Sequence, residues 1–479
     1  MRPHAAAVVT ASLTLNARVR QEARALWHLA WPILIGQLAT VGLSVVAVMM
    51  AGHASAQDLA GVSLGVSIWA ITTTTVMGVM MAINPIVAHM VGAGDHAQVP
   101  HAVRQALWNA LTVGVVAMGL VNGAAMVFDH LALEPSVRDL AQSFVHITSL
   151  GLPAYAGYRA LYGYSASLNQ TKPMMVIAVM ALLLNGLVSG LLVYGLLGLP
   201  RLGGLGCAWA TMASMWFNLL AMVWWMRRSP AYRSTWPLGR FEPPHWPTLA
   251  SQLRLGLPIG VTYFAETSAF GLIALLVARF GTTEVAAHQI ALNFASFSFM
   301  LPMSMGVAIL TRVGQAMGAG DARAARFRAW VGIAVALTFA SASALFMALF
   351  NQQIAAAYTS DRAVVALAAQ LLLLAALFQL TDASQVATSC AIRGYKVTRA
   401  PMVIHMLTFW GLSLPLGCLL GLAPAWLPFG PAQPMGAHGF WIALVVALTV
   451  AALALTALLH GVAGRHLLTS NHARPPIAV

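Results

Sequence analysis

The chain has 479 residues, of which 59% are hydrophobic and only 8% are charged. This composition excludes an ordinary soluble globular protein and is typical of a membrane protein with many spans. The formal net charge is +13, but the basic residues stand singly between apolar segments. We therefore expect contacts with anionic membrane lipid and no nucleic-acid partner.

Twelve apolar segments of about 20 residues follow one another along the chain, and this is the length that a helix needs to cross a bilayer. Helices are expected because lipid offers the backbone no hydrogen-bond partner outside the segment itself. The expected spans are residues 27–50, 59–84, 105–128, 141–165, 173–198, 205–226, 255–278, 286–311, 329–350, 364–391, 401–422 and 437–461.

The basic residues indicate the orientation of these spans. With the N-terminus in the cytoplasm, most of the 25 Lys and Arg residues fall on the cytoplasmic side, so we expect both termini to be cytoplasmic. The predicted segments are a cytoplasmic tail (1–26), an N-lobe (27–226), a proline- and arginine-rich cytoplasmic linker (227–252), a C-lobe (253–462) and a second cytoplasmic tail (463–479).

The two lobes repeat each other at a constant offset of 226 residues. The repeated features are the run Gly-Ala-Gly-Asp at 92–95 and 318–321, a proline at Pro32 and Pro258, and an acid at Asp58 and Glu284. This offset covers six spans, an even number, so the two copies cross the membrane in the same direction. The pattern predicts an all-α integral membrane protein with two pseudo-symmetric six-helix lobes and a substrate site between them.

Only two acidic residues, Glu266 and Asp382, lie deep inside apolar segments. A carboxylate in hydrocarbon costs roughly 2.5 to 3.5 kcal/mol on insertion scales, so such a residue indicates cation or proton handling. The alternative is a neutral acid that holds two helices together through a hydrogen bond. Candidate cavity residues at helical spacing from the two acids are Tyr263, Phe378, Gln379 and Gln385.

Other polar side chains in the spans are candidates for the same site. Gln289 and Asn293 lie one turn apart in the eighth span, and their oxygens suit a hard cation. Asn185 and Ser189 lie one turn apart in the N-lobe, without an accompanying acid. For each pair the alternative is ordinary hydrogen bonding between helices.

Several runs of residues are typical of one known family. They are residues 50–52 with 58–60, 85–88, 203–207, 286–293, 312–314 and 393–396. On these runs the chain resembles the multidrug and toxic compound extrusion (MATE) family, in its NorM-type bacterial branch, from about residue 27 to residue 462. The resemblance implies a twelve-helix antiporter of the bacterial inner membrane that expels organic cations in exchange for sodium or protons.

The resemblance also assigns residues. Glu266 and Asp382 match the C-lobe acids of the family's cation site, and Asn185 matches an asparagine of the N-lobe. Three positions depart from the family pattern: Ala47 replaces an acid of the first span, Phe378 replaces a tyrosine, and Ser189 replaces a second asparagine. Because the first-span acid is missing, the C-lobe pair is expected to carry the coupling.

These observations lead to one expected function and two alternatives. We expect a monomeric transporter, and no enzyme, that exports cationic drugs by alternating access, with Na⁺ as the first choice of coupling ion and H⁺ as the second, and with no other cofactor. A lipid-linked sugar flippase of the same wider superfamily would need several arginines to meet pyrophosphate, and only Arg159 and Arg312 approach the spans. A membrane scaffold would leave the two acids without a task.

Overall fold

The structure is a computed structural model, and it describes residues 15–130, 134–198, 200–423 and 433–472. Within these ranges every regular element is a helix. Eleven helical segments are long and apolar enough to cross a membrane. The remaining expected span, residues 141–165, is formed by two shorter helices that meet at Leu150 and Gly151. The prediction of an all-α protein with twelve spans is therefore confirmed.

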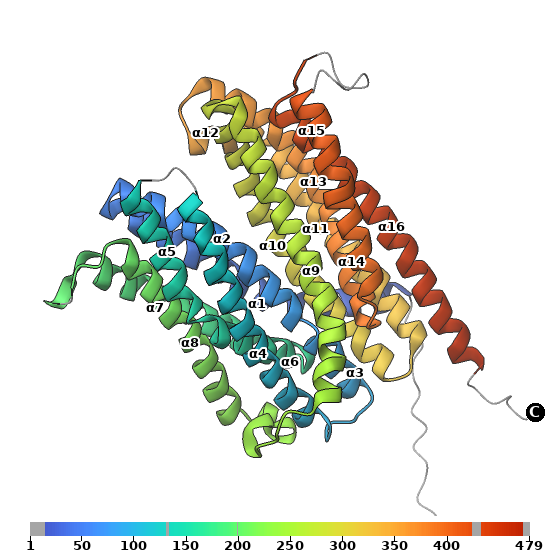
Figure 1. The fold of residues 1–479 in the computed structure, drawn as a ribbon. Helices are drawn as coiled ribbons and strands as arrows, with labels where there is room; N and C mark the ends of the chain where they lie inside the picture. Colours follow the sequence, from blue (N-terminus) through green and yellow to red (C-terminus); the bar gives the residue numbers. More distant parts are fainter. Residues whose placement is uncertain (1–14, 131–133, 199, 424–432, 473–479) are drawn as a thin grey trace, which may run out of the picture.

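The first lobe, coloured from blue to green in Figure 1, contains eight helices. They are α1 (Leu15–Ala54), α2 (Ala56–Met80), α3 (Ile83–Gly92), α4 (Val99–Ala125), α5 (Pro135–Ser149), α6 (Leu152–Ser167), α7 (Lys172–Tyr194) and α8 (Gly204–Arg228). Two pairs, α2 with α3 and α5 with α6, each form one interrupted span. Pro153 lies in the first turn of α6, where its missing backbone N–H leaves no helical bond unmade.

The second lobe, from yellow-green to red in Figure 1, follows the same order. Its helices are α9 (Trp246–Val277), α10 (Thr282–Gly318), α11 (Ala322–Leu349), α12 (Asn351–Tyr358), α13 (Arg362–Gly394), α14 (Arg399–Met406), α15 (Leu414–Leu422) and α16 (Ala437–His472). A π-helical stretch, Leu407–Ser413, joins α14 to α15 just before Pro415. Proline cannot donate a backbone hydrogen bond, and a widened turn accommodates that loss.

Short 3-10 helices complete the chain between these elements. They are Met126–His130, Leu196–Gly198, Pro230–Thr235, Pro237–Gly239 and Ala278–Phe280.

The repeat that the sequence predicts is present in the backbone. Gly94 and Gly320 end the two copies of the Gly-Ala-Gly run, and both have φ +74°. Asn169 and Lys396 follow α6 and α13 respectively, and both have φ 60° although neither is glycine. Positive φ is uncommon for a residue with a side chain, so its occurrence at equivalent points of both lobes supports a shared ancestry of the turns.

The repeated acids Asp58 and Glu284 have the same structural task in the two lobes. Oδ1 of Asp58 accepts a hydrogen bond of 2.7 Å from the backbone N–H of Gly204, where α8 begins. Oε2 of Glu284 accepts one of 2.9 Å from the backbone N–H of Ala437, where α16 begins. A carboxylate at a helix N-terminus satisfies a free N–H group and is favoured by the helix dipole. Each acid therefore stabilises the N-terminus of the last helix of its lobe.

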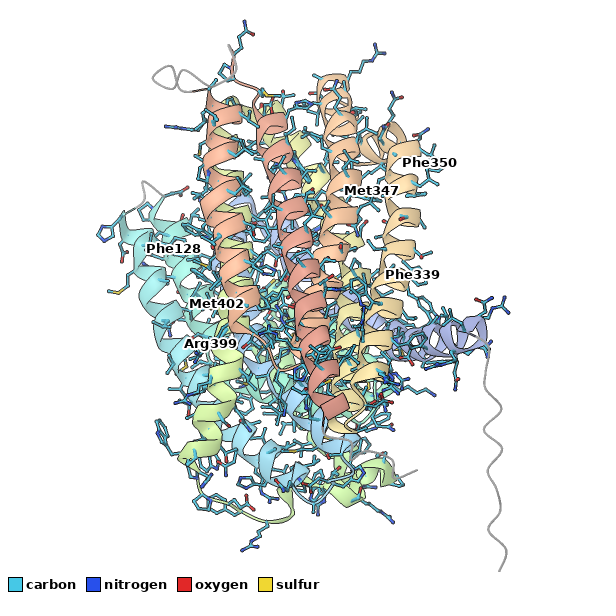
Figure 2. The ribbon with its side chains drawn as sticks, turned by 90° about the vertical axis from the view of Figure 1, so that its right-hand side faces the viewer. Phe128, Phe339, Met347, Phe350, Arg399 and Met402 are labelled. Atoms are coloured by element: carbon cyan, nitrogen blue, oxygen red, sulfur yellow. The ribbon has the colours of Figure 1, made fainter. Side chains whose placement is uncertain are left out.

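Helix α1 belongs to both lobes. Its second half packs in the N-lobe, where Ala47 and Ala51 join a core cluster with residues of α7 and α8. Its first half packs on the C-lobe through Leu26 and Ala30, which share a core cluster with α10, α11 and α16. Figure 2 shows the first turns of α1, in faint blue-violet, extending sideways beside the C-lobe.

An ion pair fixes this start of α1. Nη2 of Arg312 on α10 lies 2.5 Å from Oε2 of the buried Glu22, and Nε of Arg328 on α11 lies 3.7 Å from the same oxygen. Residues 15–26 belong to α1, within the segment that the sequence assigned to a tail. At the other terminus α16 continues to His472, past the expected span. The predictions for residues 1–14 and 473–479 lie outside the described residues.

The lobes touch at one end, which we call the linker end because the chain between α8 and α9 lies there (Figure 1). The contact is reciprocal. A Cβ atom built on Gly92 would lie 2.0 Å from the carbonyl oxygen of Gln315, and one built on Gly318 would lie 2.0 Å from that of His89. The side chains of His89 and Gln315 each donate across the interface, to the carbonyl of Gly394 at 2.8 Å and to that of Ser167 at 3.0 Å. Towards the opposite end the ribbons of the two lobes diverge (Figure 1).

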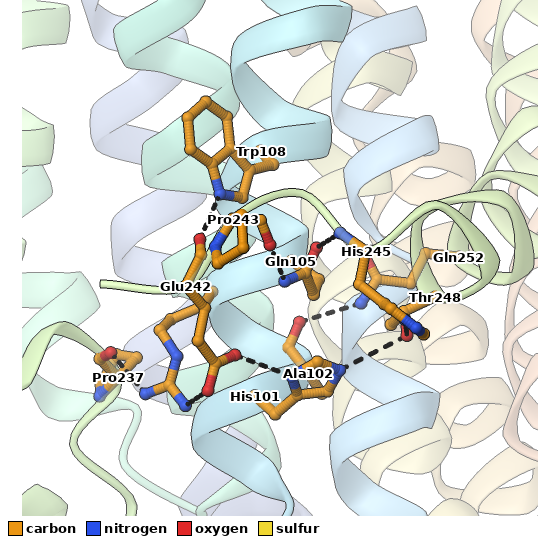
Figure 3. A network of polar contacts seen from close by, with 11 residues as sticks. His101, Ala102, Gln105, Trp108, Pro237, Glu242, Pro243, His245, Thr248 and Gln252 are labelled. Carbon is orange, nitrogen blue, oxygen red and sulfur yellow. Dashed lines mark hydrogen bonds and ion pairs between the residues drawn. The ribbon is translucent and has the colours of Figure 1, made fainter. Parts of the chain in front are cut away.

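A polar network holds the linker against α4, as Figure 3 shows. Glu242 accepts hydrogen bonds from Arg104 at 2.6 Å and from His101 at 2.7 Å. These two bonds lower the pKa of Glu242 to about 2, with the bond from Arg104 the larger cause. Gln105 exchanges two further bonds with the linker, to the carbonyl of Pro243 and from the backbone N–H of His245. The linker is therefore held on the surface of the N-lobe by hydrogen bonds to α4.

Candidate functional site

The two intramembrane acids lie in the C-lobe on adjacent elements, Glu266 on α9 and Asp382 on α13. Asp382 is 1% exposed, and neither of its carboxylate oxygens has a hydrogen-bond partner. Glu266 is partly exposed, and the two carboxyl groups interact electrostatically. Within the described part of the chain, neither acid forms an ion pair. A buried charge without a partner costs several kcal/mol, so the Asp382 carboxyl group is unfavourable in its ionised form unless a cation neutralises it.

Arg393 is a third ionisable group in this part of the C-lobe, and it lies two residues beyond the expected span 364–391. It lies on α13 and is only 3% exposed. Eleven residues separate it from Asp382, which is close to three helical turns, so both side chains lie on one side of α13. That spacing was the signal in the sequence that could have revealed it. Arg393 interacts electrostatically with Glu266 without forming an ion pair.

Tyr263 lies between Arg393 and the N-lobe. The guanidinium carbon of Arg393 is 5.1 Å from the centroid of the Tyr263 ring, and its Nη1 donates to the tyrosine oxygen at 3.3 Å. The tyrosine hydroxyl also contacts the sulfur of Met303 at 3.4 Å and that of Met81, in the break between α2 and α3, at 3.8 Å. A Cβ atom on Gly78 would lie 2.7 Å from the Tyr263 ring. This ring therefore belongs to the contact between lobes, and Arg393 covers one of its faces.

Phe378 lies in an aromatic cluster beside the acids. Its ring meets that of Phe270 at a centroid distance of 5.9 Å and that of Trp441 at 5.7 Å, both edge to face. Trp441 in turn donates to Nδ1 of His288 at 3.1 Å. Phe378 is buried and Phe270 is partly exposed, so Phe270 is the more accessible ring of these two.

A line of oxygen atoms without partners follows α13 on the side of Asp382. Gln379 donates to the carbonyl of Ser298 at 3.1 Å, which leaves its own carbonyl oxygen free. Gln385 contacts Nε2 of His405, and its carbonyl oxygen is also free. The hydroxyl of Ser389, one turn further, has no partner. Buried polar atoms are almost always paired, so an unpaired set along one helix side marks a place for a cation or ordered water.

His405 on α14 was not singled out as a site residue from the sequence. Its Nδ1 donates to the carbonyl of Pro401 at 2.7 Å. This bond assigns the proton to Nδ1, so Nε2 is left to accept a bond from the amide of Gln385. His405 therefore orients the amide of Gln385, because it contacts the amide nitrogen and leaves the oxygen without a partner.

Gln289 and Asn293 lie apart from the acids, on an exposed side of α10. Their side chains are joined by a hydrogen bond of 3.2 Å. Exposed amides inside a span are costly against lipid, so they favour a water-filled space. One turn further along the same side, Phe297 lines a cavity of about 430 Å³ between the lobes. The other lining residues come from α1 and α7 of the N-lobe: Gly42, Val45, Val46, Leu182, Leu183, Gly186 and Leu187.

Asn185 and Ser189 lie in the N-lobe, and the structure does not bring them to the C-lobe acids. Both are fully buried, and their side-chain polar atoms have no partner. Ala47 lies in the apolar cluster next to them, where Cys207 donates to its carbonyl at 3.5 Å. These two N-lobe side chains therefore offer dipoles but no charge to a cation.

A two-lobed helical bundle with unpaired acids inside one lobe, and a cavity between the lobes, defines a polytopic membrane transporter. The MatE family model matches residues 32–191 and 258–419, one copy in each lobe. The chain therefore belongs to the MatE family, which confirms the resemblance seen in the sequence.

Relatives and solved structures agree with this assignment. The chain is 42% identical over 442 residues to the probable multidrug resistance protein NorM of Chromobacterium violaceum, covering 92% of this chain and 94% of that protein. It is 42% identical over 449 residues to the multidrug resistance protein PmpM of Pseudomonas aeruginosa, covering 92% of both. The eukaryotic MATE transporter AtDTX14 has the same fold, with a TM-score of 0.84 at 19% identity over 94% of this chain and 99% of that one.

Proposed function

We propose that the protein exports organic cations, including drugs, in exchange for a coupling cation. The names of its relatives, which are multidrug resistance proteins, support the substrate class. The single observation that carries the exchange mechanism is the Asp382 carboxyl group, buried and without any hydrogen-bond partner. Such a group is stable only when a positive guest or a proton neutralises it.

Exchange follows from competition for this pair of acids. A drug cation and a coupling cation both neutralise Glu266 and Asp382, but the pair has one space, so the arrival of one guest releases the other. Alternating access then moves that space from one side of the membrane to the other, by rocking of the two lobes. The glycine contacts at the linker end are the surfaces that have to separate when this end opens.

Sodium is the first choice of coupling ion and the proton is the second. The free oxygens of Gln379, Gln385 and Ser389 near Asp382 support sodium, because hard cations take several oxygen ligands in place of their water. Two interacting carboxyl groups support the proton, because like charges favour one protonated partner. Transport rates at several sodium concentrations and one pH distinguish the two, and sodium-independent export would exclude sodium.

The proposed location is the bacterial inner membrane, with the linker end in the cytoplasm and the protein acting as a monomer. The basic residues support this orientation, because Arg227, Arg228, Arg233 and Arg240 all lie at the linker end. Transporter activity, and no enzymatic reaction, is proposed for the site. Labelling of single cysteines at the two ends of the bundle in intact cells tests the orientation.

A lipid-linked sugar flippase is the alternative function, and the buried arginines Arg159 and Arg393 favour it. Arg159 lies over the ring of Tyr162 in the N-lobe, 4.6 Å from its centroid, whereas Arg393 lies over Tyr263 in the C-lobe. A pyrophosphate group requires several donors in one place. The two arginines are in different lobes, and the C-lobe arginine shares its site with two acids, so export of cations is the function that the geometry supports best.

Dye accumulation in cells tests the proposal. Glu266→Gln and Asp382→Asn each remove one negative charge, so cells that carry either variant should accumulate ethidium as cells without the protein do. Asp139→Asn is the matched control, because this acid lies exposed near the start of α5 and, among the described residues, forms its ion pair with Arg138. Full export by both site variants, with the protein present in the membrane, would refute the mechanism.

A further inference from the structure

Three ionisable side chains lie on α9 and α13 of the C-lobe, with Glu266 interacting with both of the others, and their charges do not cancel. Glu266 and Asp382 supply two negative charges when ionised, and Arg393 supplies one positive charge. Arg393 is 3% exposed, and its polar contacts are the hydroxyl of Tyr263 and the sulfur of Met81. Neither contact neutralises a guanidinium group, and Glu266 is the acid with which Arg393 interacts electrostatically.

Arg393 is placed to act on Glu266 through space. It lies against Tyr263, and Glu266 follows Tyr263 by one turn on the same side of α9. No ion pair joins the arginine to either acid in the described residues, yet the electrostatic interaction between Arg393 and Glu266 is present. The arginine therefore lowers the negative potential of the site while leaving both carboxyl groups free for a guest.

The other charged or titratable groups around the site do not change this charge balance. His405 and His288 each use a ring nitrogen as an acceptor, from Gln385 and from Trp441, which is the neutral form of the ring. The second buried arginine, Arg159, lies against Tyr162 on α6 of the N-lobe. The site therefore has a net charge of minus one when its acids are ionised and no guest is bound.

We propose that Arg393 is a specificity-determining residue that sets the charge of the exported cation to one. The inference rests on the proposed function, because it concerns the guest of the same site. A guest with a single positive charge brings the site to neutrality, and a guest with two charges leaves a surplus positive charge in a medium of low dielectric. Charges that are buried without a partner are strongly disfavoured there.

Ethidium and propidium are matched probes for this proposal, because they share one aromatic cation and propidium carries a second positive charge on its side arm. The measurement is the dissociation constant of each dye for the purified protein. Wild type should bind ethidium more tightly than propidium. Arg393→Gln makes the site doubly negative, so the ratio of the two constants should move towards propidium on the order of 10-fold. Arg393→Lys keeps the charge and should keep the wild-type preference.

A double variant distinguishes the charge of Arg393 from a purely structural role. Glu266→Gln alone leaves a site with no net charge, so ethidium affinity should fall on the order of 10-fold. Adding Arg393→Gln to it restores a net charge of minus one, and ethidium affinity should return. A purely structural arginine predicts the opposite, a further loss in the double variant. This comparison stands even if Arg393→Gln alone does not fold.

The possible results separate the inference from the proposed function. An unchanged dye ratio in Arg393→Gln, or a double variant that does not regain ethidium affinity, overturns the role of Arg393 while export by wild type stands. A wild-type protein that neither binds nor exports ethidium overturns the proposed function itself, and the inference with it.

Discussion

Replacing Gly92 by alanine adds one methyl group at the point where the two lobes meet. The new Cβ atom would lie 2.0 Å from the backbone carbonyl oxygen of Gln315. A backbone oxygen cannot move aside by a side-chain rotation, so α3 and α10 have to separate. The gap must widen from 2.0 Å to the 3.4 Å of ordinary contact, a displacement of about 1.4 Å.

The size of the effect follows from this overlap. Overpacking of one methyl group in a tight contact costs about 1 to 3 kcal/mol, which lowers the population of the state with a closed linker end by about 5- to 150-fold. The repeat predicts that Gly318→Ala acts in the same way from the other lobe, because its Cβ atom would lie 2.0 Å from the carbonyl oxygen of His89. Gly123→Ala is the matched control, since no atom lies within 4 Å of its added Cβ.

Spin labels at Ala97 and Arg323, equivalent exposed positions of the two lobes at the linker end, report the separation in an electron-resonance distance measurement. Gly92→Ala should shift the distance distribution to longer values and reduce ethidium export, whereas Gly123→Ala should leave both unchanged. A Gly92→Ala protein with the wild-type distance distribution and wild-type export would show that this contact does not close the linker end.

Three further predictions concern stability, measured by thermal unfolding of the purified protein. Glu22→Gln breaks the ion pairs with Arg312 and Arg328. Because both arginines are partly exposed, we expect the free energy of unfolding to fall by about 1 to 3 kcal/mol. An unchanged melting temperature contradicts the packing of α1 on the C-lobe. Asp58→Asn and Glu284→Gln weaken equivalent helix starts, so each should cost about 1 kcal/mol, and an effect in only one lobe would argue against the repeat. The pKa of Glu242 is lowered from 4.5 to about 2, so its stabilising effect is complete above pH about 4.5 and is lost as the pH falls towards 2. The difference in melting temperature between wild type and Glu242→Gln should therefore be present at neutral pH and vanish near pH 2, and a difference that does not change with pH contradicts the bonds to Arg104 and His101.

Much of the fold was accessible from the sequence because it depends on local chemistry. The length and hydrophobicity of a segment are enough to predict a membrane span. The twelve expected spans correspond to helices or to interrupted helix pairs. The offset of 226 residues predicted the repeat, and Asp58 and Glu284 prove to cap equivalent helices. The sequence did not predict that these two acids cap α8 and α16, because such a cap requires a contact between distant parts of the chain.

The features that sequence reasoning missed depend on tertiary contacts. A basic residue at the end of a span is usually exposed at the membrane surface, whereas Arg393 is buried and contacts Tyr263, 130 residues earlier in the chain, and Met81 of the other lobe. His405 likewise gains its task from Gln385 on α13. The first turns of α1 were expected in a tail because they are rich in arginine, and the burial of Glu22 among them depends on Arg312 and Arg328 of the other lobe.

The central claim is that one positive guest at a time neutralises the pair of acids in the C-lobe. Competition binding tests it most directly. Ethidium is bound to the purified protein, and the coupling ion is then added, first as sodium at constant pH and then as protons at constant sodium. The account predicts that one of the two ions displaces ethidium competitively, and that Asp382→Asn abolishes this competition. Ethidium that stays bound to the wild-type protein at saturating sodium and also at saturating proton concentration would contradict the claim.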